Sequence, residues 1–217
     1  MDDDAMRALA AQLRRPSGEA GLTTAREMNE VNRPLTEAAI GALAPAPGET
    51  IAEIGPGNGK LSEPILEAIG RGGRYFGIDH SEAMAKAAQA TLSRYGNARI
   101  FAGDYRAAPL APASVDAVLA VNVIYFIDDL ALFLSTIRGW LRLGGRIVLG
   151  TRSKETLRVL PMTQHGFIVR DVFEIEAALR AARLADISRT IVPEGNVEID
   201  GRSFRLQSLV IKATARG

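Results

Sequence analysis

The sequence predicts an α/β protein with a Rossmann-like, doubly wound, mostly parallel sheet behind a helical leader. Three observations support this fold class. Between residues 50 and 149, short apolar runs alternate with segments of helical spacing, which indicates right-handed crossovers and a parallel sheet. These runs are dense in hydrophobic residues, as expected for strands covered on both faces. Near the end, two runs alternate like a half-exposed antiparallel pair, so we expect the sheet to finish with a hairpin.

The composition narrows the class of protein. The 217 residues suffice for one sizeable core, and 47% hydrophobic with 24% charged residues is typical of a globular protein. A net charge of +1 gives no reason to expect a nucleic-acid partner. The absence of cysteine excludes disulfides, thiolate metal sites and thiol nucleophiles, and we expect no metal. The acidic N-terminus and the lack of a long apolar run predict a cytoplasmic protein without a membrane span.

The leader, residues 1–47, precedes the strand–helix alternation of residues 48–217. Residues 2–15 have a helical apolar spacing that ends at Pro16, and residues 24–43 form a second helical segment. Pro34 lies inside that segment, so we expect a kink or two helices. Two roles remain open for the leader, a packing cap and a lid over a ligand site.

The elements of the alternation follow in order after a Pro-rich linker. The predicted strands are residues 50–54, 74–78, 98–101, 115–121 and 146–149. The predicted helices are residues 61–69, 82–92 with Ser81 as N-cap, and a segment from Asp128 or Asp129 to residue 141. Gly144 and Gly145 are expected to stop that last helix.

The chain beyond residue 150 is less regular. Residues 151–169 are predicted to be a long irregular stretch, followed by a helix over residues 171–183. Two strands are then expected, residues 186–192 and 203–213. The segment between them begins Pro193-Glu194-Gly195-Asn196 and is predicted to be a loop.

The stretch I-A-E-I-G-P-G-N-G-K, residues 51–60, predicts a strand that turns sharply over a ligand into a helix. Glycine permits unusual dihedrals and lets the backbone approach a bound molecule closely. A dinucleotide fingerprint would need Gly at position 60, where this chain has Lys60. A Walker loop would need Ser or Thr after that lysine, where this chain has Leu61. The turn therefore fits a pyrophosphate or a triphosphate poorly.

Acidic residues lie at or near the ends of three predicted strands. Asp79 ends the second strand, where a carboxylate can accept hydrogen bonds from a ribose diol. Asp104 follows the third strand and is placed to meet an adenine amine. Glu53 lies within the first strand, where it can face an ammonium. Ligands of open parallel sheets bind beyond the carboxyl ends of the strands, so these acids predict one site for a ribose, an adenine and a cationic amino-acid group.

With these features the chain resembles the class I S-adenosylmethionine (SAM) dependent methyltransferases, and is similar to small-molecule members of types 11 and 25. The matching motifs are E-I-G-P-G-N-G, Y-F-G-I-D, G-D-Y, V-D-A-V-L-A-V-N-V-I-Y-F and W-L-R-L-G-G-R-I-V-L. They cover roughly residues 48–150. The resemblance implies seven strands in the order 3-2-1-4-5-7-6, with strand seven antiparallel.

The resemblance also implies roles for single residues toward SAM and its product S-adenosylhomocysteine (SAH). Gly55, Gly57 and Gly59 would pass close to the methionine and ribose parts, with Glu53 facing the ammonium. The remaining roles are Asp79 on the ribose hydroxyls, His80 beside the adenine, Asp104 and the Tyr105 backbone at the adenine edge, and Asn122 near the methionine part and the transferring methyl group.

The expected acceptor is a small organic molecule methylated on O, N or C, mainly by alignment and exclusion of water. Tyr125 and His165 are the candidate bases, but a pocket wall is the favoured role for Tyr125, and a structural or exposed imidazole is the commoner role of a lone histidine. Arg152 and Lys154 are placed to meet an acceptor carboxylate or phosphate, or to form a solvated charged loop. The alternatives are a SAM-binding protein without turnover, aminopropyl transfer, a protein or RNA methyltransferase, and an NAD-binding oxidoreductase, which Lys60 disfavours. N-V-I-Y replaces the [DN]-P-P-[YF] of enzymes that methylate exocyclic base nitrogens.

Overall fold

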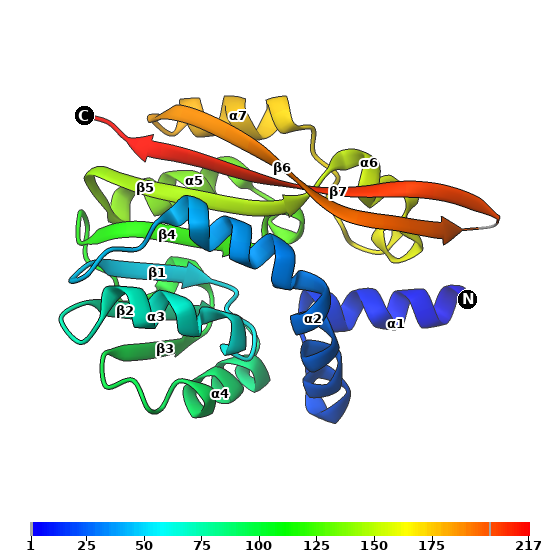
Figure 1. The fold of residues 1–217 in the computed structure, drawn as a ribbon, viewed down its shortest axis with the longest axis horizontal. Coiled ribbons are helices and arrows are strands. Elements are labelled where there is room, and N and C mark those ends of the chain that lie inside the picture. Colours follow the sequence, from blue (N-terminus) through cyan, green and yellow to red (C-terminus); the bar gives the residue numbers. More distant parts are fainter. Residues whose placement is uncertain (1, 200) are drawn as a thin grey trace.

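The computed structural model describes residues 2–199 and 201–217 and confirms the doubly wound architecture. One seven-stranded sheet has the order β3-β2-β1-β4-β5-β7-β6 (Figure 1). The strands are β1 (Thr50–Ile54), β2 (Arg74–Asp79), β3 (Ala98–Ala102), β4 (Val115–Val121), β5 (Leu141–Arg152), β6 (Leu184–Ile199) and β7 (Arg202–Ala215). Strands β1 to β5 pair in parallel, and β7 runs antiparallel to both β5 and β6.

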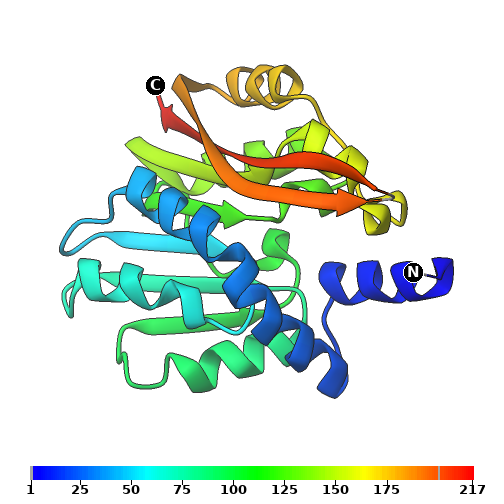
Figure 2. The same ribbon diagram turned by 45° about the vertical axis from the view of Figure 1, so that its right-hand side comes forward.

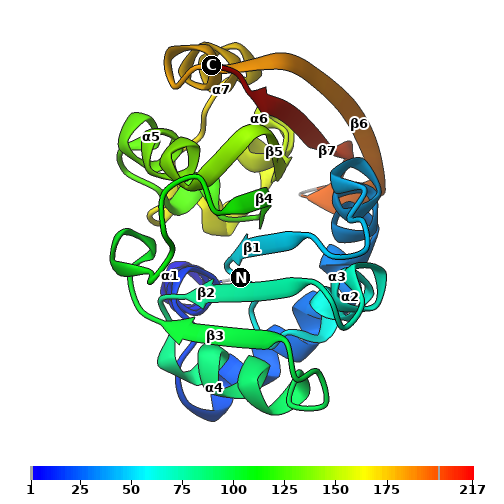
Figure 3. The same ribbon diagram turned by 90° about the vertical axis from the view of Figure 1, so that its left-hand side faces the viewer.

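Helices cover both faces of this sheet, as Figure 3 shows for α2 and α3 on one side and α5 on the other. The α-helices are α1 (Asp3–Arg14), α2 (Gly18–Leu43), α3 (Glu63–Ile69), α4 (Glu82–Thr91), α5 (Leu130–Trp140), α6 (Lys154–Val159) and α7 (Val172–Ala181). The 3-10 turns are η1 (Lys60–Ser62), η2 (Tyr105–Ala107), η3 (Ile124–Phe126) and η4 (Pro161–Gln164). None of these helices is long and apolar enough to cross a membrane.

Two hydrophobic clusters, one on each face, hold the sheet between its helices. Leu35 of α2 and Ile65 of α3 pack on one face, whereas Phe133 of α5 and Leu179 of α7 pack on the other. All five residues of β1 are buried, which explains why its sequence shows no polar alternation. Glu53 is the charged residue in that strand, so its burial requires a polar partner or a ligand.

The leader forms two helices, and the second is longer than its sequence predicts. Helix α2 begins at Gly18 and continues through Pro34 without division. The sequence does not indicate that the helix begins this early, because Gly18 and Gly21 lie in its first turn and glycine is a poor helix former. The small size of Gly21 serves packing, since a Cβ there would lie 2.8 Å from the Pro16 carbonyl carbon.

Three details of the second half correct the sequence-based expectations. Helix α5 ends at Trp140, and Gly144 and Gly145 lie inside β5 instead of capping the helix. The pairing of β4 with β5 is irregular there, and a Cβ on Gly145 would lie 3.0 Å from the Asp116 carbonyl oxygen. Residues 151–169 contain α6 and η4, where a wholly irregular stretch is expected. Ser153 caps α6, because its side chain accepts a hydrogen bond from the Thr156 amide.

The third correction concerns the hairpin. The expected loop at residues 193–196 is wrong, because these residues belong to β6. A register shift between Pro193 and Asn196 marks a bulge, and Gly195 adopts a φ of 85° in it. The hairpin therefore runs on past the end of β5, where Arg152 pairs with Ser208, as Figure 1 shows.

Candidate functional site

A cavity of about 810 Å³ lies at the carboxyl ends of β1, β2 and β4. Its walls come from the glycine turn, the strand ends, both leader helices, and the α6–η4 segment. The volume is in the range of small-molecule sites. The described residues hold no cluster of His, Asp or Glu side chains that suits a metal ion.

The three glycines of the turn all adopt positive φ, and each has its own reason to lack a side chain. A Cβ on Gly55 would lie 2.7 Å from the Val123 side chain. Gly57 lines the cavity, and a Cβ built there would meet no other atom within 4 Å, so a ligand can approach its Cα closely while its amide donates to Asp79. Gly59 packs against α4 instead, where a Cβ would lie 3.1 Å from the Ala88 Cα. Of the three, Gly55 and Gly57 reach the cavity wall.

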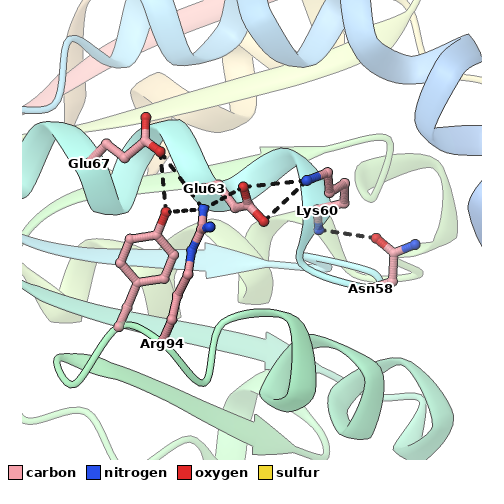
Figure 4. Close-up of polar contacts among 6 residues, drawn as sticks. Asn58, Lys60, Glu63, Glu67 and Arg94 are labelled. Atoms are coloured by element: carbon pink, nitrogen blue, oxygen red, sulfur yellow. Dashed lines mark hydrogen bonds and ion pairs between the residues drawn. The ribbon is translucent and has the colours of Figure 1, made fainter.

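Lys60, which stands where a dinucleotide fingerprint has glycine, lies outside the cavity lining. Its ammonium is 3.4 Å from a carboxylate oxygen of Glu63. The same carboxylate accepts a hydrogen bond of 2.9 Å from Arg94, and Figure 4 shows these side chains together. Lys60 therefore belongs to a group of charged side chains that links α3 to the segment after α4.

Glu53 presents a buried carboxylate to the cavity. Its Oε2 atom accepts a hydrogen bond of 2.6 Å from the Tyr75 hydroxyl. Burial raises the pKa of Glu53, against the opposing effect of the hydrogen bond from Tyr75. A ligand ammonium at this position would stabilise the ionised carboxylate.

Asp79 joins the end of β2 to the glycine turn. Its Oδ1 atom accepts from the Ser81 amide at 2.9 Å and its Oδ2 atom accepts from the Gly57 amide at 3.1 Å. Burial nevertheless raises the pKa of Asp79 to about 6. The carboxylate also lines the cavity, so it can accept further hydrogen bonds from ligand hydroxyls.

The predicted adenine side contains His80, Asp104 and Tyr105, and all three line the cavity. Burial and the nearby Arg15 and Arg14 lower the pKa of His80, so its imidazole is neutral at pH 7. The Asp104 carboxylate is already paired, since Arg106 Nε donates to its two oxygens at 2.9 and 3.0 Å. An adenine amine would therefore share this carboxylate with the Arg106 guanidinium.

Asn122 directly follows β4, the strand between β1 and β5, and lines the cavity. Its backbone has a φ of 57°, and its amide donates to the Gly150 carbonyl at 2.8 Å. The side-chain Nδ2 donates to Asn32 Oδ1 on α2 at 3.0 Å. The Oδ1 atom is buried and has no hydrogen-bond partner among the described residues. Because buried polar atoms are normally paired, this oxygen fits a ligand donor.

Three aromatic rings that pack on one another line the cavity. Tyr125 stacks on Phe167 at 5.0 Å between ring centroids, and Phe126 packs at 4.7 Å from Tyr125 and 4.6 Å from Phe167. Burial raises the pKa of Tyr125 well above its ordinary value. Its hydroxyl is therefore protonated at neutral pH and can act as a hydrogen-bond donor, whereas a phenolate base is not available.

The structure places His165 outside the cavity lining. Its Nε2 atom is 3.1 Å from Asp3 Oδ1 on α1. Arg14, at the other end of α1, donates to the Gly166 carbonyl at 3.4 Å, and Ser81 Oγ donates to the Pro16 carbonyl. Helix α1 thus joins the start of α4 to the loop after η4. Figure 2 shows it beyond the strand ends.

Several lining residues are not among the sequence-predicted site residues. Leu157, Leu160 and Met162 come from α6 and η4 and close the aromatic end. A signal for this segment was present, because Ser153 precedes a run of helix-forming residues as an N-cap does. Arg152 lines the cavity beside them and forms a buried ion pair with Glu194. Nothing in the sequence indicates that pair.

Comparison with known proteins identifies the central part of the chain. A family model described as a methyltransferase domain matches residues 52–149. Nocamycin O-methyltransferase of Saccharothrix syringae is 34% identical over 123 residues, covering 55% of this chain and 44% of that protein. Ribosomal RNA small subunit methyltransferase A of a Burkholderia species is 38% identical over 76 residues, covering 34% and 26%. The chain spans less than half the length of the curated relatives it matches.

Two solved structures share the fold over nearly the whole chain. A chain from the complex of the Haloferax volcanii Trm112 methyltransferase activator has a TM-score of 0.77 at 18% identity, covering 98% of both chains. Geranyl diphosphate C-methyltransferase from Streptomyces coelicolor A3(2) was solved with Mg²⁺, geranyl diphosphate and SAH. It has a TM-score of 0.69 at 17% identity, covering 98% of this chain and 97% of that one.

Proposed function

We propose that the protein transfers a methyl group from SAM to a small organic acceptor. Residues 52–149 match a methyltransferase domain, and the sheet has the strand order of the class I fold of SAM-dependent methyltransferases. One observation carries the proposal. The strand order β2-β1-β4-β5 places Asp79, Glu53, Asn122 and Arg152 in that order along the carboxyl edge of the sheet, and one cavity is lined by all four together with Tyr125, Phe126 and Phe167. Such an arrangement suits two ligands that meet at the middle.

The residues present fit the cofactor. Glu53 faces the ammonium, and Asp79 accepts hydrogen bonds from the ribose hydroxyls beside the exposed backbone of Gly57. The unpaired Asn122 Oδ1 accepts a hydrogen bond from the amino-acid part. When bound, SAM supplies a sulfonium that activates the methyl group, so the protein needs mainly to align the acceptor and exclude water.

The acceptor end works by positioning. Tyr125, Phe126 and Phe167 form an apolar wall, and the Tyr125 hydroxyl donates a hydrogen bond. His165 lies behind this wall and pairs with Asp3, so the proposal gives it no role as a base. An acceptor that is already nucleophilic in its bound form therefore fits this chamber best.

The leader, residues 1–47, is proposed to be a lid over the acceptor. Helices α1 and α2 supply Leu13, Met28 and Asn32 to the cavity wall. The residues of α1 that line the cavity come from its C-terminal end, whereas Met6 and Ala10 in its middle are buried. A covered chamber of this volume favours a small molecule over a folded macromolecule.

Titration calorimetry with SAM, SAH and NAD tests the cofactor. We expect micromolar binding of SAM and SAH and no binding of NAD. A screen of cell-extract metabolites with SAM carrying a labelled methyl group then tests the acceptor, and label is expected in a small-molecule fraction. NAD binding without SAM binding would overturn the cofactor assignment. Label in the RNA or protein fraction would overturn the small-molecule acceptor.

A further inference from the structure

We propose that Arg152 binds an acidic oxygen of the acceptor, so that the acceptor is an apolar organic acid bound as its anion. This inference rests on the proposed function and names the substrate class of the same cavity. Arg152 ends β5 and lines the cavity beside the aromatic chamber. Its side chain is only 12% exposed, so its charge is held at a largely apolar wall.

Glu194 holds the guanidinium in place from behind. Its Oε2 atom contacts Arg152 Nη1, and its Oε1 atom accepts a hydrogen bond of 2.7 Å from Ser208 Oγ. Glu194 is 7% exposed and lies outside the cavity lining. The bulge at Gly195 in β6 brings it to this position, because Arg152 and Val192 both pair with Ser208 of β7. The carboxylate is therefore a positioning group for Arg152.

The guanidinium keeps donors for a ligand. Arginine has five N–H donors in a fixed planar arrangement that matches a carboxylate. Arg152 Nε and Nη2 donate to none of the described residues. A buried ion pair seldom stabilises a fold more than apolar side chains of the same volume would. An anion supplied by the acceptor would use the remaining donors and would explain why a charge is kept here.

The other side chains of the chamber determine which organic group can accompany the acidic oxygen of the acceptor. Most of the lining side chains supplied by η3, by the segment from α6 to residue 167 and by β7 are apolar or aromatic, among them Tyr125, Phe126, Phe167, Leu157, Met162 and Leu206. Tyr125 lies close enough for the Arg152 charge to lower its pKa, although burial raises that pKa more. Both side chains are thus hydrogen-bond donors at neutral pH. An acidic group at one end of an apolar or aromatic body matches this arrangement, whereas a cationic amine does not.

Calorimetry on the SAH-loaded protein tests the inference with naphthoate and phenylpropionate as probe acids and their primary amides as neutral controls. We expect the acids to bind at least about tenfold more tightly than the amides. Arg152→Gln should weaken acid binding by about tenfold to a hundredfold and leave amide binding unchanged. Glu194→Gln should tighten acid binding, because it removes the competing negative charge.

Lys154→Gln is the matched control, because Lys154 is a nearby cation that pairs with Asp171 at 3.0 Å and does not line the cavity. It should leave acid binding unchanged. If Arg152→Gln does not fold, the acid affinity of Glu194→Gln tests the inference. A gain in acid affinity supports an anion site at Arg152, whereas a purely structural ion pair predicts no gain. Acids that bind no better than amides, or not at all up to millimolar concentration, overturn the inference. Loss of SAH binding by the wild-type protein would instead refute the proposed function.

Discussion

Lowering the pH from 7 to 5 is expected to weaken SAH binding through Asp79. Burial raises the pKa of this carboxyl to about 6 in the ligand-free protein. Ligand hydroxyls donate hydrogen bonds to its ionised form, so binding favours the carboxylate and protonation opposes binding. The affinity should therefore be high above pH 6 and fall as the pH drops through that value.

The size of the effect follows from the fraction ionised. With a pKa of about 6, roughly nine-tenths of Asp79 is ionised at pH 7 and roughly one-tenth at pH 5, so the dissociation constant should rise about tenfold, or about 1.4 kcal/mol. Burial raises the pKa of Glu53 as well, and this carboxylate faces the ligand ammonium. Both groups act in the same direction, so tenfold is the contribution expected from Asp79 alone when its protonated form does not bind.

Titration calorimetry with SAH at pH 5, 6 and 7 measures this dependence. The ammonium of the ligand stays protonated over that range, because an α-amino group titrates near pH 8. Asp79→Asn is the control. It should bind SAH more weakly at pH 7 and lose the part of the pH dependence that belongs to Asp79. An equal dissociation constant at pH 5 and pH 7 in the wild-type protein, or an undiminished fall in Asp79→Asn, would refute the reasoning.

Two further predictions separate folding from binding at the cavity wall. Gly59→Ala and Gly57→Ala both place an alanine at a positive φ, of 77° and 57°, but only at Gly59 would the Cβ also press on Ala88. Gly59→Ala should therefore destabilise the protein more, by about 1–3 kcal/mol in chemical denaturation, whereas Gly57→Ala should also weaken SAH binding. Equal stability of the two variants would contradict this division. Ser81→Ala removes both the α4 N-cap and the hydrogen bond to the Pro16 carbonyl, at a cost of about 1 kcal/mol, and should make α1 more sensitive to proteolysis. An unchanged cleavage rate at the α1–α2 junction would show that this hydrogen bond does not hold the leader.

That Glu53 and Asp79 line one cavity was predictable from sequence, because parallel strands present their carboxyl ends at one edge. Glu53 and Asp79 lie in or at the end of adjacent strands, so the order β2-β1-β4 alone brings them together. What each carboxylate contacts was not predictable. The Asp104 carboxylate accepts hydrogen bonds from Arg106, two residues away. The Glu53 carboxylate accepts a hydrogen bond from Tyr75, because these two residues lie on neighbouring paired strands.

The acceptor end was less predictable because it is built from departures from regular structure. His165 lies outside the cavity lining, and α1, at the far end of the sequence, brings Asp3 against it, which the position of His165 in the sequence does not indicate. The Pro-Glu-Gly-Asn segment has the composition of a loop. In the folded chain its backbone still pairs with β7 on both sides of the bulge, so cross-strand hydrogen bonding outweighs the local preference.

The bulge at residues 194 and 195 of β6 determines the position of Glu194 and so bears on the proposed class of acceptor. Two residues of β6 fall between the pairs Pro193–Gln207 and Asn196–Arg205, and only one residue of β7, Leu206, faces them. Glu194 contacts Arg152 from this bulge, and Leu206 on the partner strand lines the cavity. A true loop at 193–196 would have left Arg152 as a solvated charge at a strand end. The extension of the hairpin instead holds the guanidinium, largely buried, at the cavity wall. The inference of an anionic acceptor rests on this placement, because an arginine at the end of a strand does not by itself indicate an anion site.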